Sequence, residues 1–278
     1  TNRRIWVLFQ NTAMLLCVAL AVTPAFKMKF WNLGGNGQIL IGCLAAIACM
    51  FYLGGKMPDA VLILIMTAAS IVAGAIWGVL PAIFKAFFGT NESLFTLMLN
   101  YIATGLVSMF ITIWVKSGSG VLNPLEAGNF PDLFGVKYLL TVVVFFVLAG
   151  LMYIYLNYTK HGYEISVVGD SPNTAKYIGI DVKRVIIRTM LISGALAGVV
   201  GLFLAGGIEH TIDTDTANNM GFTAIMATWL AAFNPLVMMG TCFFIIFISK
   251  GMVQVRGDFG FTNDSIANIV IGLVYFCV

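Results

Sequence analysis

The stretch "VIIRTMLISGALAGVVGLFLA", residues 185–205, contains a single charged side chain, Arg188, among apolar and small residues. A helix of about 20 mostly apolar residues is long enough to cross the roughly 30 Å hydrocarbon core of a bilayer. Small residues recur along this stretch at helical spacing and share one face, namely Gly194, Ala197, Gly198, Gly201 and Ala205. Such faces let helix backbones approach closely inside a membrane. We therefore predict a transmembrane helix in tight contact with a neighbour, and Gly74 and Gly78 form a second face of this kind.

Composition extends this prediction to the whole chain of 278 residues. Hydrophobic residues make up 60% of it and charged residues 10%, with a mean hydropathy of +0.95. Soluble domains carry about 25% charged residues. We therefore expect an all-α polytopic membrane protein, a single transmembrane domain over 1–278 trimmed at both ends. Nine apolar segments can be drawn, at 5–26, 37–53, 60–80, 94–115, 136–156, 185–205, 219–233, 235–249 and 264–278.

Three of these segments, 37–53, 219–233 and 235–249, are short for a full span and have glycine or proline at their flanks. Broken backbone at membrane depth survives only where protein buries it or where it lines a wet cavity. The stretches "NLGGNGQILIGCLAA" (32–46) and "NMGFTAIMATWLAA" (219–232) are similar, and the number of spans between them predicts opposite directions. An inverted repeat with interrupted segments is typical of transporters.

The distribution of charged residues predicts the orientation of the chain in the membrane, and the His and Cys residues give no sign of a metal site or a disulfide framework. Five cations lie between residues 157 and 188, so we expect this connection on the cytoplasmic side and the 208–218 loop outside. A net charge of +3 gives no indication of nucleic acid as a partner. The two histidines are isolated, and the five cysteines show no CxxC spacing, so we expect no metal site and no disulfide framework.

The segment 157–184 is polar in an otherwise apolar chain. Ser171 can cap a helix that begins at Pro172 and stops at Gly179. In this short helix Ala175 and Ile178 share an apolar face, with Tyr177 beside them. The segment is either a loop that packs on the protein's own helices or a surface that another protein covers.

The sequence "HGYEISVVGDSPNTAKYIGIDVKRV" (161–185) closely resembles the cytoplasmic loop of ATP-binding-cassette (ABC) importer permeases of the branched-chain amino acid/ribose superfamily. In that family a G-x-N-x-x-A-A-x-x-x-G-I-like segment forms a coupling helix that docks on the ATP-hydrolysing subunit. Here Thr174 stands where alanine is usual. The resemblance implies coupling roles for Gly169, Asp170, Ser171, Pro172, Asn173, Ala175, Tyr177, Ile178 and Gly179.

Further motifs resemble the nucleoside and simple-sugar branch of the superfamily, whose full-length members have ten helices. They are "FWNLGGNGQILIG" (30–42), "GTNESLFTLMLNYIA" (89–103), "ISGALAGVVG" (192–201) and "GFTAIMATWLAAFNPL" (221–236). Trp31 is inserted into the first motif, and Asn36 replaces its usual glutamate. In the last motif, "TWLAAFNPL" (228–236) replaces an A-L-L-G-x-x-N-P-like stretch.

Candidate substrate-path residues follow from both arguments. Asn32, Asn36 and Gln38 lie at a broken helix. Their uncharged amides can donate hydrogen bonds to a nucleoside and accept them from it, or they can simply cap the following helix. Asn91 and Glu92 fit a helix start as well as a path. Asn100 should face the bundle or the pore, since a buried asparagine needs a partner, and Tyr101 follows it.

The function indicated is the permease subunit of an ABC importer for nucleosides, in a bacterial cytoplasmic membrane. No G-x-x-x-x-G-K-[ST] motif occurs, so ATP and Mg²⁺ would bind to separate ATPase subunits, and no catalytic residues are expected. The resemblance implies as partners two ATPases, a second homologous permease or a self-copy, and an extracellular substrate-binding lipoprotein. A ribose- or galactose-type sugar permease is the first alternative. A secondary transporter or channel would need ionisable residues in its spans.

Overall fold

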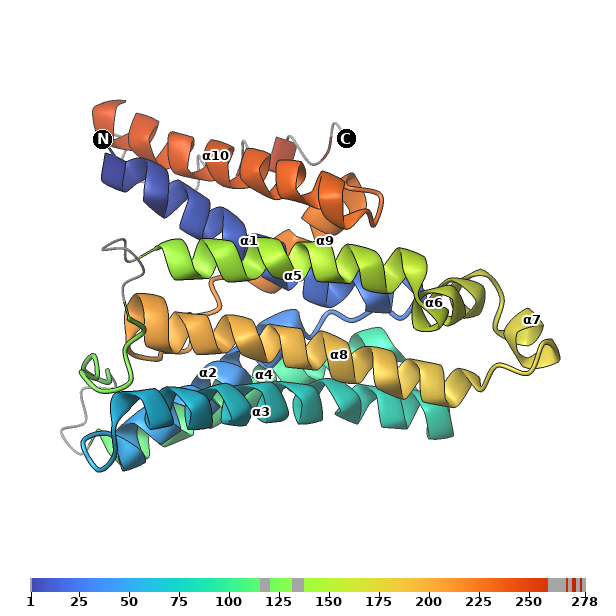
Figure 1. Cartoon of the computed structure of the whole chain (residues 1–278), viewed down its shortest axis with the longest axis horizontal. Coiled ribbons are helices and arrows are strands. Elements are labelled where there is room, and N and C mark those ends of the chain that lie inside the picture. The colour runs from blue at the N-terminus through green and yellow to red at the C-terminus, as the bar shows by residue number, and fades with distance from the viewer. Residues whose placement is uncertain are drawn as a thin grey trace.

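The computed structural model of the chain describes residues 2–115, 121–131, 138–259 and the single residues 269, 272, 273 and 276. Its described part is helical (Figure 1). The helices are α1 (Asn2–Lys27), α2 (Gly35–Leu53), α3 (Asp59–Phe88), α4 (Glu92–Trp114), α5 (Leu139–Tyr158), α6 (Lys160–Asp170), α7 (Pro172–Tyr177), α8 (Val182–Phe203), α9 (Met220–Leu230) and α10 (Pro235–Phe259). A π-helical turn, Leu204–Glu209, extends α8.

Seven helices in the described ranges are long and apolar enough to cross a membrane, namely α1 to α5, α8 and α10. The expected segment 219–233 is short, as predicted, because α9 has 11 residues. The prediction of a short segment was wrong at 37–53, since the 19 residues of α2 are long and apolar enough to span, and at 235–249, since α10 continues to Phe259. Lys250 and Gln254 end the apolar run there without breaking the helix, because both residue types are good helix formers. The segment 264–278 lies largely outside the described residues.

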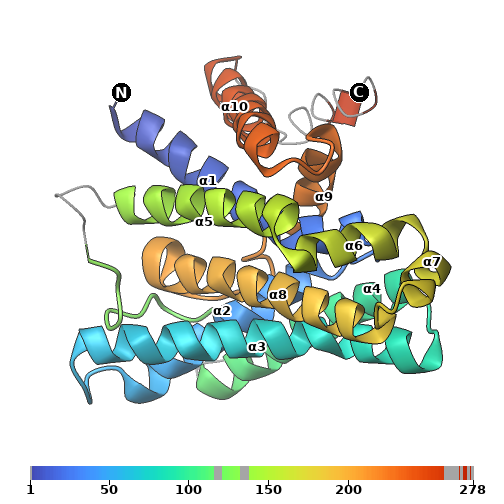
Figure 2. The ribbon, with the colours of Figure 1, turned by 45° about the vertical axis from the view of Figure 1, so that its right-hand side comes forward.

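The predicted small-residue faces pack against each other, and α3 and α8 lie side by side in Figures 1 and 2. We call Gly74 and Gly78 of α3 together with Gly194 and Gly198 of α8 the glycine seam. A Cβ atom on Gly74 would lie 2.8 Å from the Cα atom of Gly198, and one on Gly78 would lie 2.9 Å from the Cα atom of Gly194. Real Cβ atoms essentially never approach this closely, so the backbones touch only because the side chains are absent.

The two similar stretches 32–46 and 219–232 include the starts of α2 and α9, and these helices run in opposite directions. The first residues of α2 and α9 adjoin, because a Cβ atom on Gly35 would lie 3.2 Å from the Cα atom of Gly221. From there α2 leads to the start of α3, and α9 leads to the start of α10. Figure 1 shows α3 and α10 beginning at opposite ends of the bundle. Helices α2 and α9 thus leave a common point in opposite directions.

The segment 157–184 contains the short helix that the sequence predicts, and it is more helical than expected. Its first part is the 11-residue helix α6, which follows α5 almost directly, and α7 comes after it. Helix α6 ends at Asp170, and Ser171 alone separates it from α7. In Figure 1 these two helices project from one end of the bundle, away from the turn between α2 and α3.

Candidate functional site

A non-helical stretch between α1 and α2, residues 28–34, is held in place by side chains from several helices. Asn100 of α4 accepts a hydrogen bond from the Gly37 backbone N–H (2.8 Å) and donates one to the Leu33 carbonyl (2.9 Å). Thr96, one turn earlier, accepts from the Leu33 N–H (3.1 Å). Backbone groups freed by the break are therefore bonded inside the protein, as the interior of a membrane requires.

Asn32 and Gln38 form a buried pair of amides at the same break. Each donates its side-chain N–H to the other's oxygen at 3.4 Å, and the Asn32 oxygen also accepts from the Gly34 backbone N–H (3.0 Å). Asn32 further donates to the Ser193 hydroxyl of α8 at 3.4 Å. Both amides are at most 2% exposed, so in this conformation they bond to the protein rather than to water.

Asn36 joins the starts of α2 and α9. Its side-chain oxygen accepts a hydrogen bond of 2.8 Å from the backbone N–H of Gly221, at the start of α9. The residue is partly exposed, unlike Asn32 and Gln38. We call Asn32, Asn36, Gln38, Thr96, Asn100 and Ser193 the polar junction.

The other path candidates lie outside this junction. Asn91 caps α4 by accepting from the Leu94 N–H (3.2 Å), and Glu92 pairs with Lys85 of α3 at 2.7 Å. Both therefore serve the turn between α3 and α4. Tyr101 is 79% exposed and is turned away from the contacts that Asn100 makes.

The short helix α7 is fixed by its own ends. Ser171 accepts from the Thr174 N–H (3.3 Å), and Pro172 occupies the first turn. At the other end the Gly179 N–H bonds to the Lys176 carbonyl and the Ile180 N–H bonds to the Ala175 carbonyl. This pattern, with Gly179 at φ +86°, is a Schellman stop. The predicted cap and the glycine stop are confirmed.

The predicted outward strip needs a correction. Ala175 is completely buried, because it sits on the side of α7 that packs toward α6 and α8. Tyr177 and Ile178 are 93% and 50% exposed. Gly169 is buried as well, and a Cβ atom there would collide with the Lys27 carbonyl oxygen at the end of α1. Exposed groups in the coupling segment, residues 169–179, are therefore those of Asp170, Pro172, Asn173, Thr174, Lys176, Tyr177, Ile178 and Gly179.

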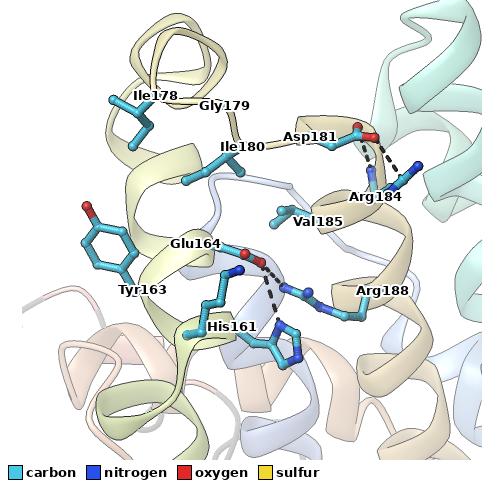
Figure 3. A pocket seen from close by; sticks show the side chains of 11 residues that line it. His161, Tyr163, Glu164, Ile178, Gly179, Ile180, Asp181, Arg184, Val185 and Arg188 are labelled. Carbon is cyan, nitrogen blue, oxygen red and sulfur yellow. Dashed lines mark hydrogen bonds and ion pairs between the residues drawn. The ribbon is translucent and has the colours of Figure 1, made fainter.

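A cavity of about 560 Å³ lies beside the coupling segment, between α6 and α8 (Figure 3). Glu164 of α6 stands at its centre, 2.8 Å from the Arg188 guanidinium of α8 and 3.6 Å from His161. Burial opposes the ionisation of Glu164, but the hydrogen bond and charge of Arg188 outweigh it, so the pKa of Glu164 lies below its ordinary value. This ion pair ties α6 to α8 under the projecting helix.

Comparisons with known proteins match this architecture. A family model described as the permease component of branched-chain amino acid transport systems covers residues 7–278. The chain belongs to this permease family. It is thus a multi-pass protein of the cytoplasmic membrane.

Relatives of this permease carry names for several cargoes. A guanosine ABC transporter permease protein of Bacillus subtilis is 30% identical over 76% of this chain and 62% of its own length. A nucleoside ABC transporter permease protein of Lactococcus lactis is 28% identical over 98% of this chain and 77% of its own. A glucose ABC transporter permease protein of Haloferax volcanii is 27% identical over 87% and 67%.

The permease thus spans less than two thirds of the Bacillus relative's length. The comparison with solved structures found no match.

Sequence reasoning missed several residues of the permease's site. Thr96 and Ser193 bond to the break, and both stand within motifs quoted above, "GTNESLFTLMLNYIA" and "ISGALAGVVG". The signal available in the sequence was a hydroxyl residue within the apolar stretch of each motif. The pair of Glu164 and Arg188 had no such signal, because its partners are 24 residues apart on two helices whose packing the sequence does not reveal.

Proposed function

We propose that this chain forms the translocation path of an ABC importer for nucleosides. The observation that carries the proposal is the similarity along 98% of the chain to a permease named for nucleosides. The polar junction supports it, because amide and hydroxyl groups match the neutral hydrogen-bonding groups of a ribose and a base. The path would open where Asn36 bridges α2 and α9.

Transport by this chain requires partners. We propose two ATPase subunits, which bind ATP and Mg²⁺, a second permease or a self-copy, and an external lipoprotein that delivers the substrate. The sequence has no phosphate-binding motif of its own, and the chain acts as a transport subunit rather than an enzyme. The single transmembrane domain holds the path, and α6 and α7 face the cytoplasm.

The exposed tip of α7 is the proposed contact with the ATPase. Tyr177 and Ile178 offer apolar surface that the chain itself does not cover. Aromatic residues are favoured in the centres of protein interfaces. The ion pair between Glu164 of α6 and Arg188 of α8 would transmit a movement of α7 to α8.

A sugar importer is the second candidate, because a relative named for glucose matches 87% of the chain. The two functions are separated by uptake of labelled guanosine, uridine, ribose and glucose into cells that express the permease with its cognate partners. We expect ATP-dependent accumulation of nucleosides that excess ribose does not inhibit. Accumulation of sugars alone would favour the second candidate, and uptake by the chain without ATPase would exclude both.

Asn36→Ala tests the path in the same assay. The substitution removes the acceptor of the Gly221 N–H, and an unsatisfied buried donor costs about 1–3 kcal/mol. We expect uptake to fall at least fivefold while the ATPase still co-purifies with the permease. Tyr101→Ala is the matched control, because this exposed side chain of α4 makes no contact with the junction. Wild-type uptake by Asn36→Ala would exclude the residue from the path.

A further inference from the structure

Two tryptophans from distant parts of the chain meet next to the polar junction. The indole rings of Trp31 and Trp229 stack with their centroids 5.8 Å apart and their planes 20° apart. Phe26 meets the Trp31 ring edge-on at 5.5 Å, and Phe233 meets the Trp229 ring in the same way at 5.4 Å. We call Trp31 and Trp229 the tryptophan platform.

Both members of the platform are departures from the motifs that the chain otherwise resembles. Trp31 is inserted between Phe30 and Asn32, and Trp229 belongs to the stretch "TWLAAFNPL" that replaces the usual one. Each departure alone has no evident purpose. Their direct contact makes them one feature, built from both halves of the protein.

The platform is open on one side. Trp31 is 45% exposed and Trp229 is 51% exposed. Neither indole N–H donates a hydrogen bond to another described residue. A centroid separation of 5.8 Å leaves no room for a third ring between them, so the surface available to a ligand is the outer one.

Contact with lipid does not account for this surface. Trp31 stands on the non-helical stretch 28–34, beside the exposed Lys29, and irregular backbone does not face the hydrocarbon region of a bilayer. Trp229 is on α9, whose 11 residues are too few to cross a membrane. Half-helices of this kind line substrate sites where the two repeats of a transporter meet.

The exposed face of α9 connects the platform with the junction. Phe222, Met226 and Trp229 lie three or four residues apart and are 38%, 45% and 51% exposed. This stripe begins next to Gly221, which bonds to Asn36, and ends at the platform. A substrate that leaves the polar junction along α9 therefore meets the indole rings.

We propose that the tryptophan platform stacks on the planar base of a nucleoside during its passage, and so selects substrates that carry an aromatic ring. The proposal rests on the nucleoside function proposed above. Every nucleobase has a flat π-face, and stacking on an aromatic side chain tolerates differences among bases. The free indole N–H groups are donors that a base or a ribose hydroxyl can accept from.

Leucine and phenylalanine substitutions separate stacking from packing. Trp31→Leu and Trp229→Leu keep apolar bulk without a ring, whereas the phenylalanine variants keep a ring. In the complete transporter we expect guanosine uptake to fall about tenfold in the leucine variants and less than threefold in the phenylalanine variants. Phe247→Leu, at a 57% exposed position on α10, is the matched control and should transport at the wild-type rate.

Each other outcome overturns the proposal. Wild-type uptake by both leucine variants would exclude stacking. Loss of the second permease from the purified complex of the leucine variants would make the platform a subunit contact instead. The unmodified transporter reports separately on the proposed function: uptake of sugars without nucleosides overturns both proposals, whereas intact nucleoside uptake in the leucine variants overturns the platform alone.

Discussion

The glycine seam and the coupling segment both depend on glycine, but for opposite purposes. In the seam, Gly74 and Gly198 let two long helices touch backbone to backbone, and nothing beyond the chain is needed to complete the contact. In the coupling segment, Gly179 stops a six-residue helix and leaves its tip, Tyr177 and Ile178, in solvent. The seam is buried within the chain, whereas the tip of the segment is surface that the chain itself leaves uncovered.

The glycine seam therefore forms a rigid part of the bundle, and the tip of α7 projects from it. Helix α8 connects the two regions, because it forms one side of the seam and its Arg188 pairs with Glu164 of α6, the helix that precedes α7. A force applied to the tip of α7 is therefore carried into the most closely packed pair of helices. Substitutions in the seam should destroy the fold, and those in the segment should leave the fold intact and uncouple it.

The largest effect is expected for Gly74→Val. Its Cβ atom would lie 2.8 Å from the Cα atom of Gly198, and backbone cannot move aside without separating α3 from α8. We expect no monodisperse protein after detergent extraction, as measured by size-exclusion chromatography. Gly105→Val on α4, where a Cβ atom meets nothing within 4 Å, is the control and should extract normally. If both variants elute as the same monodisperse protein, close packing at the seam is not needed for the fold.

A smaller, local effect is expected for Gly179→Val. A β-branched residue at φ +86° is strained by about 1–2 kcal/mol or more, so the Schellman stop of α7 should be lost. We expect normal extraction but at least a fivefold loss of substrate-stimulated ATP hydrolysis by the assembled transporter. Gly240→Val, in open space on α10, should hydrolyse ATP normally. If Gly179→Val does so too, the shape of α7 is irrelevant to coupling.

The two regions also differ in what the sequence predicts about them. The seam was predictable because small residues at helical spacing are a local pattern, as were the cap by Ser171 and the stop at Gly179. The burial of Ala175 was not, because it depends on how α7 packs toward α6 and α8. The amides of Asn32, Gln38 and Asn100 were singled out as polar residues at a break, but which helices they join follows only from tertiary structure.

The smallest effect concerns the tie between α6 and α8. The pKa of Glu164 is lowered in the folded protein, so its ion pair stabilises fully above the ordinary value of 4.5 and loses this contribution as the pH falls through the lowered pKa. We expect Glu164→Gln to melt about 2–4 °C below the wild type at pH 7, from a loss of about 1 kcal/mol. The difference should shrink as the pH falls through this lowered pKa. A difference that persists in acid would mean that packing, rather than charge, gives Glu164 its effect.

The central claim is that the exposed tip of α7 binds the ATPase, and Tyr177→Glu tests it most directly. At 93% exposure the side chain supports no part of the fold, so a charge there harms only a surface that a partner must bury. The measurement is the amount of ATPase that co-purifies with the permease, with Tyr163→Glu on α6, at 61% exposure, as the control. The account predicts at least a tenfold loss of bound ATPase for Tyr177→Glu and little change for Tyr163→Glu. Full retention of ATPase by Tyr177→Glu would contradict it.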